Sequence, residues 1–114
     1  MTTTTDTTVL AGEQVNAAGA LLALLTSHPN LPAPNIRLNP MQVPGTYEWT
    51  WGLHVALHDR LDHFEQWRTA LGLAPSAVDQ GHRGNTAWLT VAGAYSGVPI
   101  ELHGFYRLGP DAER

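Results

Sequence analysis

The stretch TYEWTWGLHVAL, residues 46–57, is the clearest β-strand in the chain. Large apolar residues alternate with small or polar ones, which is the two-residue period of a strand with one buried face. We expect the apolar face to lie in the core and His54 to stand in the middle of the other face. The residues predicted to be buried are Tyr47, Trp49, Trp51, Leu53, Val55 and Leu57.

An amphipathic helix is predicted directly after this strand, at residues 60–72. Its apolar stripe includes Phe64 and Trp67 at helical spacing. Asp59 is the predicted N-cap, and Gly72 is the predicted stop after the last turn. Strand and helix together therefore form the centre of the predicted fold.

The flanking segments complete an α+β domain. Residues 9–26 suit an alanine- and leucine-rich helix, and residues 35–40 a short edge strand. Segments 75–81, 85–92 and 98–108 predict three further strands, with Trp88 expected in the core. The order α-β-β-α-β-β-β indicates an antiparallel-rich sheet with two helices on one face.

The predicted domain spans residues 9–108. The threonine-rich start, residues 1–8, is expected to be a disordered tail, and residues 109–114 a frayed C-terminal tail. Neither a signal peptide nor a membrane-spanning stretch is recognisable, so we expect a soluble, cytoplasmic protein.

Composition excludes several function classes. The 114 residues include no cysteine, which rules out disulfides and thiolate chemistry. All six basic residues are arginine, and the formal net charge is −4. Nucleic-acid binding requires a concentrated basic patch, which this sequence lacks. No phosphate-binding loop or nucleophile motif is present.

Three residues form the candidate site. If the apolar faces of strands 46–57 and 98–108 pack on the same helix, His54, Glu101 and His103 share the open side of the sheet. Imidazole and carboxylate groups bind zinc, nickel, iron or manganese where no thiolate is available. Two or three ligands from one chain are too few for a closed site, and a two-fold dimer would double them. The histidines at 58, 63 and 82 are expected to be solvated.

Segments GLHVAL, RLDHFEQWRTALGL and PIEL resemble one βαβββ module of the vicinal oxygen chelate superfamily, which includes glyoxalases and bleomycin-resistance proteins. The resemblance covers residues 51–107 only. His54, Trp67 with Leu71-Gly72, and Glu101 occupy the positions of that pattern. It implies a cupped sheet made from two modules, here supplied by a homodimer, with a metal or small molecule in the cup.

Two functions remain open. The first is an accessory or regulatory domain that binds a protein partner or itself, without chemistry of its own, through an apolar surface that includes Trp49 and Trp51. The alternative is a dimeric small-molecule-binding protein, or a metal-dependent enzyme of glyoxalase-like type. In that enzyme His54, Glu101 and His103 would be the metal ligands, or Glu101 would be the catalytic base.

Overall fold

The computed structural model describes residues 10–43 and 45–108, and within these ranges it contains two α-helices and five strands. The predicted tails at 1–8 and 109–114 lie outside the described residues. Two short 3₁₀ turns, η1 and η2, accompany these elements. In chain order the elements are η1 (Ala11–Gln14), α1 (Val15–Ser27), β1 (Asn35–Gln42), β2 (Trp49–His58), α2 (Leu61–Ala70), η2 (Pro75–Ala77), β3 (Asp79–Arg83), β4 (Thr86–Tyr95) and β5 (Val98–Arg107).

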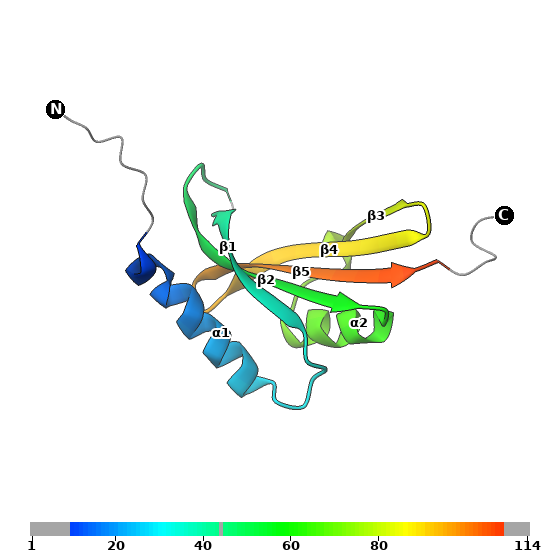
Figure 1. The fold of residues 1–114 in the computed structure, drawn as a ribbon, viewed down its shortest axis with the longest axis horizontal. Helices are drawn as coiled ribbons and strands as arrows, with labels where there is room; N and C mark the ends of the chain where they lie inside the picture. The colour runs from blue at the N-terminus through cyan, green and yellow to red at the C-terminus, as the bar shows by residue number, and fades with distance from the viewer. Residues whose placement is uncertain (1–9, 44, 109–114) are drawn as a thin grey trace.

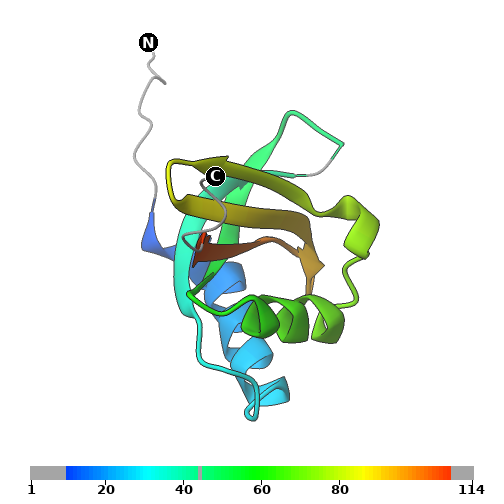
Figure 2. The ribbon, with the colours of Figure 1, turned by 90° about the vertical axis from the view of Figure 1, so that its right-hand side faces the viewer.

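The described strands form one mixed sheet in the order β1-β2-β5-β4-β3. Strands β2 and β5 lie side by side in parallel at its centre, and the other neighbouring pairs are antiparallel. The predicted edge strand, β1, is confirmed. The predicted fold class and element order are also confirmed, since both helices cover the same face (Figures 1 and 2).

The core lies between this face of the sheet and the two helices. Strand alternation places Leu53, Val55 and Leu57 on the inner face of β2, as predicted, and all three are buried. Phe64 and Trp67 come from α2 and are also buried. Complete burial of an apolar side chain of this size stabilises the fold by about 1.5–3 kcal/mol. The rest of the cluster consists of Ala17, Ala20, Leu24, Val91, Val98, Ile100 and Leu102.

Trp67 also ties the segment between α1 and β1 to the core. Its indole Nε1 donates a hydrogen bond of 2.7 Å to the carbonyl oxygen of Pro32. The ring of His28 meets the same indole edge-on, with centroids 5.7 Å apart. The loop that follows α1 is therefore fastened to α2 at a fully buried side chain.

Two of the predicted core residues are not buried. Tyr47 is 94% exposed and lies in the turn before β2, which begins only at Trp49 and not at residue 46 as predicted. Trp49 is 67% exposed, although it alternates in phase with Leu53. The β1–β2 hairpin extends past the helices at this end of the sheet, so no helix covers these side chains (Figure 1). Trp51, one pleat further in, is half-buried and packs against the core.

The start of α2 also differs from the prediction. Asp59 adopts a left-handed backbone with φ of 68°, and its N–H donates to the carbonyl oxygen of Phe105 at 2.7 Å. Arg60 occupies the N-cap position without a side-chain cap and pairs with Asp62 at 2.6 Å. The left-handed residue is where the chain turns from β2 into α2. The predicted stop at Gly72 is confirmed by its φ of 70°.

The third strand is shorter than predicted. Pro75–Ala77 forms η2, and β3 begins only at Asp79. Proline fixes its own backbone near helical values and has no N–H to donate to a sheet, which favours the turn over the strand.

Candidate functional site

The face of the sheet opposite the helices carries the predicted site. Side chains of neighbouring Cα partners point to the same face of a sheet. In the parallel β2–β5 pair His54 is the partner of Glu101, and in the β1–β2 pair it is the partner of Arg37. His103 lies two residues beyond Glu101 on β5 and shares its face. The three predicted ligands therefore lie together on the open face.

His54, His103 and Glu101 are also in contact. The two imidazole rings stack, with centroids 4.2 Å apart and an interplanar angle of 24°. Nε2 of His103 lies 3.2 Å from Oε1 of Glu101, and its Nδ1 lies 3.3 Å from the hydroxyl oxygen of Thr90 on β4. Both nitrogens of His103 thus have partners, which hold the ring against His54.

His54, by contrast, has an unsatisfied nitrogen. Its Nδ1 is buried and is the one buried side-chain nitrogen or oxygen in residues 10–43 and 45–108 without a hydrogen-bond partner. Burial lowers the pKa of His54 below its usual value, and the nearby His103 and Arg37 lower it further, while Glu101 and the backbone of His54 itself act in the opposite direction. The imidazole is therefore neutral near pH 7. A buried polar atom without a partner is rare and is typical of a site that water, an ion or a ligand completes.

The stacked pair belongs to a longer row of rings. The ring of His103 is nearly parallel to that of Phe105, with centroids 6.1 Å apart, and Phe105 stacks on His58 at 5.1 Å. The row thus runs His54, His103, Phe105, His58: its two ends lie on β2 and its two middle rings on β5. His58 is exposed, as predicted, and its ring also takes part in this row. Its spacing of four residues from His54 on one strand was the available signal.

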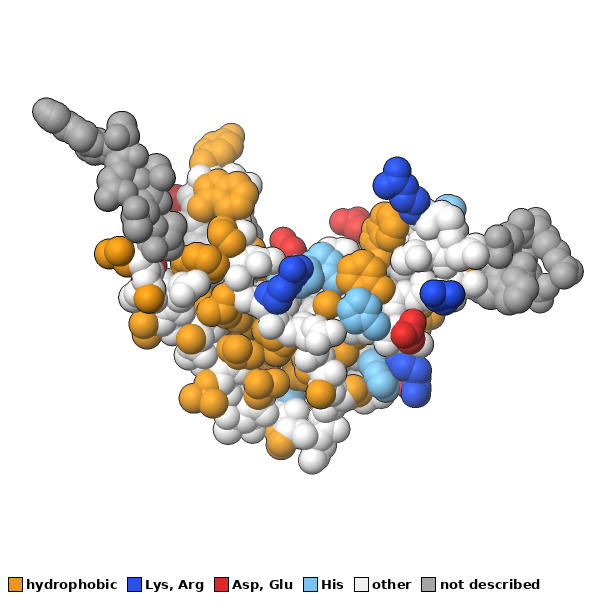
Figure 3. All heavy atoms as spheres, viewed as in Figure 1, with side chains coloured by type: hydrophobic (Ala, Val, Ile, Leu, Met, Phe, Trp, Pro, Cys, Tyr) orange, Lys and Arg blue, Asp and Glu red, His pale blue; other side chains and the backbone are white. Residues whose placement is uncertain are grey.

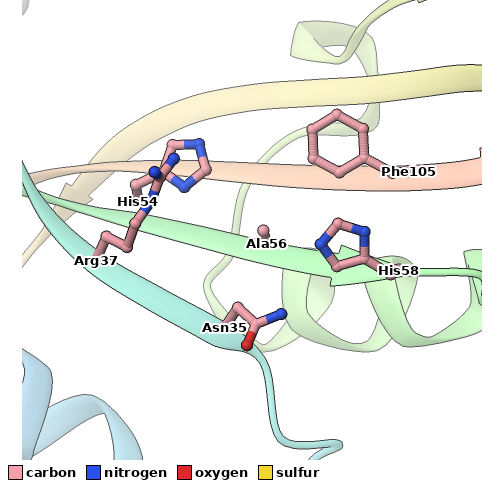
Figure 4. Close-up of a pocket in the computed structure, with 6 residues that line it drawn as sticks. All are labelled: Asn35, Arg37, His54, Ala56, His58 and Phe105. Carbon is pink, nitrogen blue, oxygen red and sulfur yellow. The ribbon is translucent and has the colours of Figure 1, made fainter.

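A hollow of about 380 Å³ lies beside this row (Figure 3). Figure 4 shows Ala56 at its centre, with His54 and Arg37 toward one end and His58 and Phe105 toward the other. The lining is completed by Asn35. The side chain of Arg37 forms no hydrogen bond or ion pair with any other described residue. Its charge is therefore available to an anion in the hollow.

The metal prediction remains a prediction. Among the described residues, no group of three or more histidine, aspartate or glutamate side chains is arranged to hold a metal ion. Imidazole lone pairs lie in the ring plane, so two stacked rings do not converge on one ion, and Glu101 already contacts His103. Metal binding would require a ring to rotate, or ligands from a second chain as the dimeric hypothesis supposes.

The tryptophans divide between the two sides of the molecule. Trp49 is exposed and Trp51 is half-buried, so Trp49 is the more accessible of the two predicted interface residues. Trp88 was predicted to lie in the core, and this was wrong. It is the Cα partner of Phe105 and so lies on the open face, where its ring covers Gly81. A β-carbon at Gly81 would come within 2.8 Å of that ring, so glycine makes room for it.

Comparisons with known protein families, with curated proteins and with solved structures found no match for this chain. In the part of the chain that the structure describes, no helix is long and apolar enough to cross a membrane.

Proposed function

We propose that this protein binds a small organic molecule on the open face of its sheet, in the hollow over Ala56. The observation that carries the proposal is the uncovered hollow beside His54, a half-buried histidine whose buried Nδ1 has no hydrogen-bond partner among the described residues. His54 lies on β2, one of the two central strands, so its position is held by neighbours on both sides. Sites on central strands place their side chains accurately because the scaffold is rigid.

The topology supports the resemblance to the vicinal oxygen chelate superfamily. Elements β2, α2, β3, β4 and β5 follow the order strand, helix and three strands, and β2 lies parallel beside β5. This arrangement brings His54 next to Glu101, the two positions that the resemblance selects. We propose such a module, with a second copy covering the open face. The activity that we propose is ligand binding. If the protein is instead a glyoxalase-like enzyme, Glu101 remains the predicted catalytic base.

Filling the hollow tests this proposal without removing a polar group. Ala56→Ile keeps a residue that favours strands and places three extra carbons in the hollow. Ala94→Ile is a matched control, because Ala94 also belongs to the open face but does not line the hollow. We expect fragments from a chemically mixed library to shift backbone amide signals of β2 and β5 in wild type and Ala94→Ile, but not in Ala56→Ile. Absence of shifts in wild type, or equal shifts in all three proteins, would overturn the proposal.

A second candidate function is pairing with another copy of this chain through α1. The outward face of α1 carries Val15, Leu22 and Leu25, and Leu22 is 69% exposed. Residues 15–27 include no charged side chain. A helix that is apolar all round is expected to be buried all round. Antiparallel pairing of two such helices would oppose their dipoles and bring Glu13 of one copy toward His28 of the other.

Introduced cysteines test this pairing cleanly because the chain has none of its own. In an antiparallel pair, Val15→Cys and Leu25→Cys chains should crosslink with each other when mixed under mild oxidation, and neither should crosslink efficiently with itself. Thr69→Cys, an exposed position on α2, is the control. Equal crosslinking of the control, or a monomer at all concentrations in analytical ultracentrifugation, would refute the pairing.

A further inference from the structure

The hollow is bounded along β2 by two histidines. On β2, His54 and His58 are four residues apart, which corresponds to about 13 Å along a strand. Between them stands Ala56, whose methyl group leaves the space above the sheet open (Figure 4). Phe105 lines the same hollow from β5. A planar ring placed over Ala56 would thus meet aromatic side chains on both sides along the strand.

The polar groups of the hollow lie on the neighbouring edge strand. Asn35 is the Cα partner of Ala56, and Arg37 is the partner of His54. Both side chains are exposed, and neither makes a hydrogen bond with another described residue. Glu101 does not line the hollow, and its carboxylate is in contact with His103. The polar side of the hollow therefore presents a positive guanidinium and an amide, with no acidic side chain among the lining residues.

We propose that the hollow binds a planar aromatic carboxylate, with the ring over Ala56 and the carboxylate on Arg37 and Asn35. The proposal rests on the proposed function and specifies its ligand class. A guanidinium pairs with a carboxylate through two parallel hydrogen bonds, and aromatic rings pack favourably in stacked or edge-on contact. The amide nitrogen of Asn35 would donate a further hydrogen bond. The ring of His54 bounds the hollow at the end where Arg37 lies.

Ligands of other classes would contact only some of the residues that line the hollow. An inorganic anion would engage Arg37 and leave the rings uncovered. A neutral ring would cover Ala56 and Phe105 but leave the guanidinium without a partner. An aliphatic carboxylate of similar size would satisfy Arg37 and lose the flat contact with His58 and Phe105. The combination of rings and one unpaired cation therefore favours a ligand that is both flat and singly negative.

The test compares benzoate with two close analogues. Benzamide has the same ring without the charge, and cyclohexanecarboxylate has the charge without the flat ring. Binding is measured by titration of backbone amide and histidine ring signals in NMR spectra of the full-length protein. We expect benzoate to bind most tightly and Arg37→Gln to weaken it about tenfold or more, because hydrogen bonds to charged groups are the stronger kind. Benzamide binding should not respond to Arg37→Gln.

Arg107→Gln is the matched control. Arg107 is an exposed arginine on the same face of β5 but does not line the hollow. Both variants change exposed side chains, so both should fold, which thermal unfolding verifies. Equal weakening by the two variants would show a general charge effect and overturn the assignment of Arg37.

The possible results distinguish a wrong ligand class from a wrong proposed function. If benzamide shifts the signals around Ala56 and benzoate does not, the hollow binds ligands but the carboxylate class is wrong. If benzoate binds and Arg37→Gln has no effect, the proposed role of Arg37 is wrong, and with it the class. If neither probe nor the fragment library shifts the open face, the proposed function fails as well.

Discussion

The imidazole rings of His54 and His103 stack across the two central strands, with centroids 4.2 Å apart. His54 is the Cα partner of Glu101, and His103 is two residues further along β5, so the contact runs diagonally between the strands. The stack joins a side chain with a buried, unpaired nitrogen to one whose two nitrogens both have partners. His103 is thus one of the neighbours that lower the pKa of His54.

Stability should fall as the pH drops below about 6.5, in part through His54. Burial, His103 and Arg37 lower the pKa of His54 in the folded protein, and together they outweigh Glu101 and the backbone of His54, which raise it. In the unfolded chain the histidine has its ordinary pKa of 6.5. Between pH 6.5 and the lowered pKa of the folded protein, the unfolded chain therefore binds more protons than the folded chain. The contribution of His54 to the free energy of unfolding is complete above pH 6.5, and it is lost as the pH falls from 6.5 to the lowered pKa.

Urea unfolding at pH 7.5 and pH 5.5 measures this effect. His54→Asn removes the titrating group, and we expect a smaller loss of stability between the two pH values than in wild type. All other ionisable groups are the same in the two proteins. The effect of His54 is therefore the difference between wild type and variant in how strongly stability depends on pH. A variant whose pH dependence is at least as steep as that of wild type would contradict the prediction.

Trp67→Phe should destabilise the fold by about 1–3 kcal/mol, because it leaves the Pro32 carbonyl oxygen without its donor and removes part of a fully buried ring. Trp49→Phe is the matched control. Trp49 is mostly exposed, so its replacement should change the free energy of unfolding by no more than about 0.5 kcal/mol. Chemical denaturation measures both, and equal effects would mean that the indole hydrogen bond is not important.

Gly104→Ala should destabilise the protein by about 1–3 kcal/mol through overpacking. A β-carbon at Gly104 would lie 2.8 Å from Cδ2 of Phe64, a ring that is fully buried. The contrasting substitution is Gly19→Ala on α1, where an added β-carbon meets nothing within 4 Å and helix propensity favours alanine by about 0.5–1 kcal/mol. Thermal unfolding should show opposite shifts. A second change, Phe64→Leu, should reduce the penalty of Gly104→Ala if the clash is its cause.

The metal version of the site makes a separate prediction. If two chains combine His54 and Glu101 around an ion, the purified protein should be a dimer that takes up nickel or zinc. His54→Ala should abolish that uptake and leave the fold intact. Elemental analysis together with the mass in solution measures both quantities. A protein that contains no metal and does not respond to added nickel or zinc would exclude this version.

Local sequence patterns predicted much of the architecture. The alternation in residues 46–57 correctly separated the inner Leu53 and Val55 from the outer His54. The alternation in residues 98–108 likewise placed Glu101 and His103 on the open face with His54, since a strand has a strict two-residue period. The helix stop at Gly72 was predicted because few other residues adopt its left-handed backbone. These features depend on near neighbours in the chain.

Features that depend on contacts between distant segments could not be predicted from local sequence patterns. The period of a strand identifies a face but does not indicate how far the helices extend over it, and so Tyr47 and Trp49 were wrongly assigned to the core. Trp88 was wrongly assigned to the core. Its ring lies on the open face, where glycine at position 81 leaves room for it, and this contact arises only when β3 pairs with β4.

The row of rings and the hollow over Ala56 likewise arise only when β1, β2 and β5 come together in register. The sequence by itself determined which side chains of one strand share a face. Tertiary packing decided which of them touch and which remain uncovered, because those relations depend on strand order and on where the helices end.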